Sequence, residues 1–156
     1  MKQLRDTLSK VLRSTHPHSE VETLIANTVT KYDIQRIIEH GSLISLPVKE
    51  SSPSRLGECH AMTAYQHMLN PSIQVYSGFC LIFEDVVADQ WYHHSFAVQD
   101  GYILEPTNWI RNKYFGVALD RQQTRAFVLN EVDKLLALAK WMDLDTDLIA
   151  NYRHTH

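Results

Sequence analysis

The stretch QWYHHSFAVQDGYILEPT, residues 90–107, decides the fold class of this chain of 156 residues. Aromatic and β-branched side chains, which favour strands, lie on both sides of Gln99-Asp100-Gly101, and this tripeptide is typical of a tight hairpin turn. We therefore predict two antiparallel strands, Gln90 to Gln99 and Tyr102 to Leu104, the second of which runs into Glu105.

Towards the N-terminus, a further strand is predicted from Ile73 to Glu84, and apolar residues at helical spacing predict a helix that begins at Cys59. We expect Gly57 or Ser54 to cap this helix. The segment Ser42 to Leu56 contains prolines and shows no period, so it is predicted to be a loop that leads the chain to the site.

The two ends of the chain are predicted to be helical. Leu4 to Leu12 and Val21 to Thr28 show helical spacing, and Gly41 ends this part. After a short strand from Tyr114 to Leu119, Asp120 is expected to cap a long helix with an apolar stripe. The last residues, Tyr152-Arg153-His154-Thr155-His156, are interpreted as a frayed polar terminus rather than a metal-binding tail.

The pattern indicates an α+β fold in a single domain, 1–156. The helix that begins at Cys59 is expected to pack on a small antiparallel sheet in a catalytic-like core, 55–120. Additional N-terminal helices are expected in 1–41, and a C-terminal helix is expected in 120–150.

Composition limits the classes of function. With 44% hydrophobic and 21% charged residues, the chain is expected to form one globular domain. No apolar run approaches the roughly 18 residues of a membrane span, and the first residues lack the apolar core of a signal peptide, so we expect a cytoplasmic protein without a membrane partner. The formal charge of −3 disfavours a nucleic-acid partner. No cofactor is expected, and nothing in the sequence indicates the oligomeric state.

Cys59 is predicted to be a reactive thiol. At a helix start, the partial positive charge of unpaired amides favours the thiolate, and the same amides can stabilise the oxyanion that forms when a thiolate attacks an acyl carbonyl. The alternative is a small buried cysteine, and this is the interpretation we give Cys80, which lies in the apolar run from Phe79 to Phe83.

A histidine pair supplies the candidate base. Because adjacent strand residues point to opposite faces, only one of His93 and His94 can face the thiol, and alternation groups His94 with Phe96. We assign the base to His94. His60 follows Cys59 by about a hundred degrees around the helix and is expected to point elsewhere.

Glu105 is the candidate third member of a catalytic triad. It ends the strand after the histidine strand, where a hairpin would bring it beside His94 and let it accept the imidazole N–H. Asp100 competes for this role, but its place in the turn explains it without catalysis.

These motifs resemble the transglutaminase-like branch of the papain-like cysteine enzymes. The resemblance rests on Gly57-x-Cys59, Tyr76-Ser77-Gly78-Phe79, His94-x-Phe96, Gly101 and Glu105-Pro106-Thr107. Small bacterial and phage proteins with a Cys-His-acid pattern share it. The family usually has Asp where Glu105 stands and Trp where Phe96 stands.

The resemblance implies that Cys59 is the nucleophile, His94 the base and Glu105 the orienting acid. It implies a thiol-dependent acyl-transfer enzyme: an amide or ester hydrolase, a deamidase or a transglutaminase-like transferase acting on a peptide, a protein or a small amide. Tyr76, Trp91 and Tyr92 each carry a polar group and are the candidates for a second oxyanion donor or a substrate-lining group.

Two other functions stay open. Cys59, His60, His93 and His94 form two adjacent pairs that would bind a metal, although zinc sites prefer wider spacings such as C-x2-C. A catalytically inactive binding module of the same fold is the other alternative, and its thiol would have an ordinary pKa.

Overall fold

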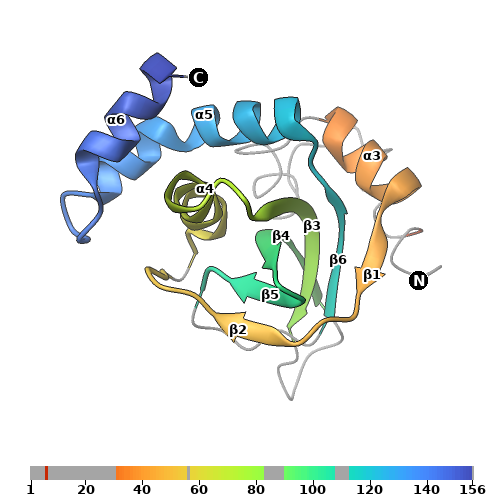
Figure 1. Ribbon diagram of the computed structural model, residues 1–156. Helices are drawn as coiled ribbons and strands as arrows, with labels where there is room; N and C mark the ends of the chain where they lie inside the picture. Colours follow the sequence, from red (N-terminus) through yellow and green to blue (C-terminus); the bar gives the residue numbers. More distant parts are fainter. Residues whose placement is uncertain (1–5, 7–30, 56, 83–89, 108–112, 156) are drawn as a thin grey trace. The chain divides into compact units, whose positions relative to one another are not determined.

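The computed structural model describes residues 6, 31–55, 57–82, 90–107 and 113–155. This part of the chain combines helices with a six-stranded sheet (Figure 1), which confirms the prediction of an α+β class. The helical patterns predicted in Leu4 to Leu12 and Val21 to Thr28 lie outside the described residues. Helix α3 (Lys31–His40) is described, and Gly41 follows it as predicted.

The sheet has the strand order β1-β6-β3-β4-β5-β2. Its strands are β1 (Ser42–Ile44), β2 (Val48–Glu50), β3 (Gln74–Ile82), β4 (Gln90–Gln99), β5 (Tyr102–Glu105) and β6 (Lys113–Ala118). Strands β4 and β5 pair antiparallel, with Ala97 opposite Leu104. Between them, Asp100 and Gly101 have φ angles of 51° and 79°, as a two-residue turn with two positive φ angles requires. The predicted hairpin is confirmed.

The predicted loop from Ser42 to Leu56 is wrong in part, because it contains β1 and β2. Both strands are three residues long, too short to show an alternating pattern, and all three residues of β2 are exposed. The sheet is also not purely antiparallel, since β2 runs parallel to β5 with Val48 opposite Ile103. Backbone hydrogen bonds, and not an apolar face, hold β2 in place.

The chain forms two compact units. In the described part, the first comprises residues 6, 31–45, 77–82, 90–94 and 113–117, and the second comprises 46–55, 57–76, 95–107 and 118–155. In the first unit, Ile37 of α3 packs against Phe79 and Phe115, and these three side chains are at most 1% exposed. Cys80 is fully buried, so its predicted place in the core is confirmed.

In the second unit, helices α4 (Cys59–Leu69), α5 (Arg121–Leu138) and α6 (Thr146–Thr155) pack side by side (Figure 1). The Tyr65 hydroxyl of α4 accepts a hydrogen bond of 2.8 Å from the Asp145 amide just before α6. The buried members of this core include Met62, Tyr65, Met68, Val128, Val132, Leu135, Leu138, Leu144, Ile149 and Tyr152.

The two helix caps predicted from the sequence have different outcomes. Asp120 caps α5 as predicted, and its carboxylate accepts the Gln123 amide at 2.8 Å in a capping box. The predicted cap of α4 is wrong: the N-cap is Glu58, which makes no side-chain capping hydrogen bond, while Gly57 before it has a φ of 78°. The Glu58 side chain therefore does not cap the first turn of α4.

The predicted single C-terminal helix is two helices, α5 and α6. The interpretation of residues 152–156 as a frayed terminus is also wrong, because α6 extends to Thr155 and Tyr152 is buried. Tyr152 lies on the face of α6 that α5 covers. The polar residues around it at the end of the sequence gave no sign that this side chain is buried.

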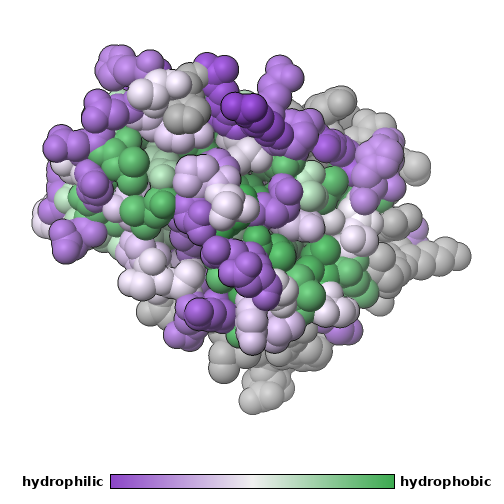
Figure 2. Space-filling view, viewed as in Figure 1, coloured by the Kyte–Doolittle hydropathy of each residue, from purple (hydrophilic) through white to green (hydrophobic). Residues whose placement is uncertain are grey.

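The surface is mixed in character. Figure 2 shows hydrophilic residues among the apolar ones over the region of α5 and α6. Trp141, between these helices, is 83% exposed. In the part of the chain that the structure describes, no helix combines the length and the apolar character that a membrane span needs.

Candidate functional site

Cys59 is the first residue of α4, as predicted, and its side chain is partly exposed. The Glu58 carbonyl accepts the Met62 amide at 2.9 Å, which is the first hydrogen bond of the helix. The Glu58 side chain does not cap the amides of the first turn. The thiol thus stands in the positive field of a helix start.

Glu58 is turned towards α5 instead. Its carboxylate forms an ion pair of 2.6 Å with the Lys134 ammonium, and the Glu58 side chain is 22% exposed. This pair connects the residue before the thiol to the next long helix of the same unit. Sequence reasoning did not identify Lys134, because nothing local indicates which charge on α5 meets Glu58.

Glu131 of α5 is a buried acid beside the thiol. Burial raises the pKa of its carboxyl above the ordinary value, His60 and Lys134 lower it, and Cys59 and Glu58 raise it. The thiol and the imidazole are thus among the groups that act on this carboxyl. The sequence carried a signal for Glu131, since it lies three residues after Val128 and four before Leu135, on the apolar stripe of α5.

His60 does not stand apart from the site. Its Nδ1 lies 2.6 Å from the Ser95 hydroxyl oxygen of β4, and its ring meets Phe127 edge to face. The Thr63 hydroxyl, one turn further along α4, donates to the Ser95 carbonyl at 3.1 Å. Ser95 therefore fixes both the first turn of α4 and the imidazole next to the thiol. Helical spacing cannot reveal this contact, because it joins residues 35 positions apart.

Glu105 is 1% exposed and firmly held. Its Oε1 accepts hydrogen bonds from the Thr107 amide at 3.1 Å and the Thr107 hydroxyl at 2.8 Å. The backbone carbonyl of Glu105 accepts a hydrogen bond from the Ser51 hydroxyl at 2.9 Å. The Ser51 hydroxyl oxygen in turn accepts one from the side-chain amide of Gln66 in α4. The acid-Pro-Thr motif thus contains its own support for the carboxylate, and Glu105 is tied to the helix that begins with Cys59.

His94 and His93 are both buried on β4, 2% and 8% exposed. The His94 ring lies 6.1 Å from that of Tyr114, and the His93 ring meets Phe79 edge to face at 5.6 Å. The two imidazoles have different aromatic neighbours, in agreement with strand alternation. Both belong to the first unit, whereas Cys59 and Glu105 belong to the second, and the convergence of the triad stays a prediction.

The candidate oxyanion or substrate-lining groups are described in part. The Tyr76 ring stacks on Phe96 with centroids 5.2 Å apart and planes 11° apart, and the Tyr92 side chain is partly exposed. Trp91 lies on β4, but its side chain is outside the described part. Their role stays a prediction.

The metal-binding alternative used Cys59, His60, His93 and His94. Among the residues that the structure describes, no group of three or more His, Cys, Asp or Glu side chains is placed to hold a metal ion. His60 instead contacts the Ser95 hydroxyl, and Glu58 pairs with Lys134.

Comparison of the chain with protein-family models, with curated proteins and with solved structures gives no match. The resemblance to transglutaminase-like enzymes therefore rests on the residues quoted for it.

The buried acid leads to a prediction about pH. The pKa of Glu131 is raised in the folded protein, so the folded state binds the carboxyl proton more tightly than the unfolded state does. The resulting stabilisation of the folded state is fully present below the ordinary carboxyl pKa of 4.5 and is lost as the pH rises. We expect Glu131→Gln to raise the unfolding temperature at pH 7.5, and the gain to vanish towards pH 4. Thermal unfolding followed by circular dichroism at both pH values measures this.

Asp133→Asn is the matched control, because Asp133 lies on the same helix but is exposed. It should show no such gain at neutral pH. A Glu131→Gln protein that is less stable than the wild type at pH 7.5 would mean that the ionised carboxylate stabilises the fold.

Proposed function

We propose that this protein is a thiol-dependent acyl-transfer enzyme with Cys59 as its nucleophile. The observation that carries the proposal is the setting of the thiol, which is partly exposed in the first turn of α4, where the N-cap side chain makes no capping hydrogen bond. Amides at such a position favour a thiolate, and they also stabilise the oxyanion of a tetrahedral intermediate. The proposal includes a papain-like, transglutaminase-like arrangement of the core.

In the proposed mechanism, His94 takes the proton from the Cys59 sulfur. The thiolate attacks the carbonyl carbon of an amide or ester, and the C–S bond forms as the carbonyl electrons move to oxygen. When the carbonyl re-forms, the bond to the leaving amine or alcohol breaks, and His94 returns the proton to the leaving group. Water or an amine then attacks the acyl-enzyme, with His94 again accepting a proton, and the thiol is restored.

Glu105 accepts the imidazole N–H of His94 in this mechanism and stabilises the imidazolium. The two hydrogen bonds from Thr107 to its Oε1 support the role, because an acid that orients a base must itself be fixed. Its burial supports the role further, since the attraction between a carboxylate and an imidazolium is stronger away from water.

Glu131 and His60 complete the surroundings of the thiol. An ionised Glu131 carboxylate opposes a thiolate at Cys59, and the raised pKa of Glu131 favours the neutral form of this acid. His60, held by Ser95, lowers the same pKa.

The test is acylation by 4-nitrophenyl acetate, a small activated ester. We expect one acetyl group on Cys59, located by mass spectrometry of peptides, and a burst of 4-nitrophenolate. His94→Asn should slow acylation by about a hundredfold or more, which is the usual contribution of a general base.

His93→Asn is the matched control, because His93 is the neighbouring buried imidazole of the same strand. It should acylate at nearly the wild-type rate. Equal slowing in the two variants would exclude His94 as a specific base, and the absence of any acetyl group on Cys59 would favour the inactive binding module.

A further inference from the structure

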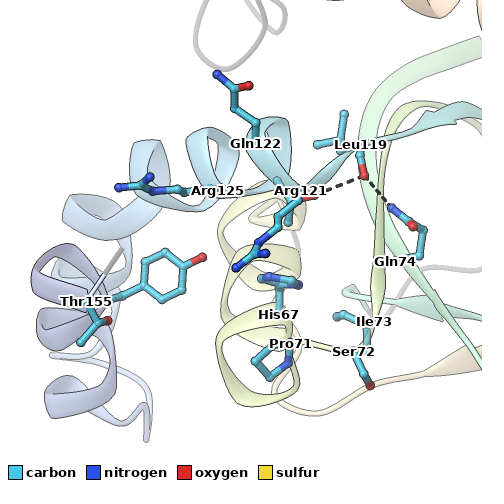
Figure 3. Close-up of a pocket in the computed structure, with 12 residues that line it drawn as sticks. His67, Pro71, Ser72, Ile73, Gln74, Leu119, Arg121, Gln122, Arg125 and Thr155 are labelled. Carbon is cyan, nitrogen blue, oxygen red and sulfur yellow. Dashed lines mark hydrogen bonds between the residues drawn. The ribbon is translucent and has the colours of Figure 1, made fainter.

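A cavity of about 780 Å³ lies at the end of α4 that is remote from Cys59 (Figure 3). Its volume is within the range of about 300–1,000 Å³ that is usual for small-molecule sites. His67, at the far end of α4 from Cys59, lines it, so the cavity begins about 12 Å further along the helix. Its wall is made by His67, Pro71, Ser72, Ile73, Gln74, Leu119, Arg121, Gln122, Thr124, Arg125, Tyr152 and Thr155.

The two arginines of this wall have no acidic residue beside them in the lining. Arg121, Arg125 and His67 line the cavity, and none of the twelve lining residues is Asp or Glu. The chain as a whole has a formal charge of −3, so the positive character is local. Figure 3 shows Arg121 directed towards His67 and Arg125 extending towards α6.

The two arginines lie at an unfavourable place for cations. They are four residues apart on the first turns of α5, where like charges repel and the helix dipole favours anions. The Asp120 carboxylate is engaged with the Gln123 amide at 2.8 Å. Among the described residues, no acidic side chain forms an ion pair with Arg121 or Arg125. An anion in the cavity would relieve both unfavourable terms.

The cavity also has an apolar part. Ile73, Leu119 and Pro71 line it, and Tyr152 is 7% exposed. Gln74 is fixed at the edge of the cavity, since its side-chain amide donates a hydrogen bond to the Leu119 carbonyl at 2.7 Å. Burial raises the pKa of the Tyr152 phenol, and the Arg125 guanidinium lowers it. Both side chains line the cavity.

We propose that this cavity binds a small organic anion whose carboxylate or phosphate pairs with Arg121 and Arg125 and whose apolar part packs on Ile73 and Leu119. A guanidinium donates two parallel N–H bonds to either kind of oxyanion. The proposal is independent of acyl transfer, because none of its residues is among Cys59, His94 and Glu105.

The test is isothermal titration of the Cys59→Ala protein, which excludes acyl chemistry, with four probes. Phenyl phosphate and benzoate carry an oxyanion and a ring, inorganic phosphate lacks the ring, and phenol lacks the charge. We expect one of the first two to bind at least about tenfold more tightly than inorganic phosphate or phenol, and the tighter one identifies the source of the oxyanion as phosphate or carboxylate.

Arg121→Gln and Arg125→Gln should each weaken binding by about tenfold. Arg153→Gln is the matched control, since Arg153 is an exposed helical arginine that pairs with Asp133 outside the cavity, and it should change binding less than about twofold. Amide chemical shifts in NMR spectra should move around His67, Ile73 and Leu119.

Three results would overturn the proposal: phenol binding as tightly as phenyl phosphate, affinities that Arg121→Gln and Arg125→Gln leave unchanged, and no saturation by any anion up to roughly 10 mM. The substituted arginines are exposed, so the variants are expected to fold, and circular dichroism verifies this.

Discussion

Cys59→Ala is expected to abolish acyl transfer, by at least about a thousandfold, without harm to the fold. Alanine cannot form an acyl-enzyme, and removal of a nucleophile is among the largest single losses that an enzyme shows. The position is the partly exposed start of α4, where alanine is a good helix former, so the unfolding temperature should hardly change. Release of 4-nitrophenolate from 4-nitrophenyl acetate and thermal unfolding measure the two effects.

Cys80→Ala is the matched control. Cys80 is fully buried in β3, so its truncation leaves a small cavity and should lower the free energy of unfolding by about 1 kcal/mol. Its acyl transfer should persist at temperatures where the protein is folded. Acyl transfer that survives Cys59→Ala and disappears in a folded Cys80→Ala protein would show that Cys80, and not Cys59, is the nucleophile.

Gly78→Ala is expected to destabilise the first unit by more than about 3 kcal/mol, which is the upper end of the usual cost of overpacking. A Cβ atom at Gly78 of β3 would lie 1.9 Å from the Phe115 carbonyl oxygen and 2.5 Å from the Gly116 Cα of β6. Both neighbours are backbone atoms of a paired strand, so neither can rotate away. Urea unfolding measures the loss.

Gly101→Ala distinguishes this steric effect from the ordinary preference of glycine. Gly101 has a φ of 79°, but nothing lies within 4 Å of the position that a Cβ would occupy. Its replacement should cost about 1 kcal/mol through backbone strain alone. If Gly78→Ala cost no more than Gly101→Ala, then β3 and β6 would not approach each other as closely as described.

Local chemistry made much of the fold predictable. The hairpin around Asp100-Gly101 and the capping of α5 by Asp120 depend on residues within four positions of one another, and both are confirmed. Strand β2 depends on its parallel neighbour β5, far along the chain, and its three exposed residues carry no apolar pattern. A short edge strand of this kind has no signature in a single sequence.

The candidate site divides in the same way. The positions of Cys59 at a helix start and Glu105 at a strand end follow from local patterns, and the structure agrees with both. The contact of His60 with Ser95 and the influence of Glu131 on the thiol come from packing of α4 against β4 and α5. Of these two features, only Glu131 has a signal in the sequence, because it is an acid on the apolar stripe of a helix.

The central claim is that Cys59 is an activated thiol, and the most direct measurement is its rate of alkylation by iodoacetamide as a function of pH. Cys80→Ala provides the background, and His94→Asn tests the base. The account predicts a rate that stays high below pH 7 and falls when His94 is replaced. A rate that rises only near the ordinary thiol pKa of about 8.5 and does not depend on His94 would contradict it.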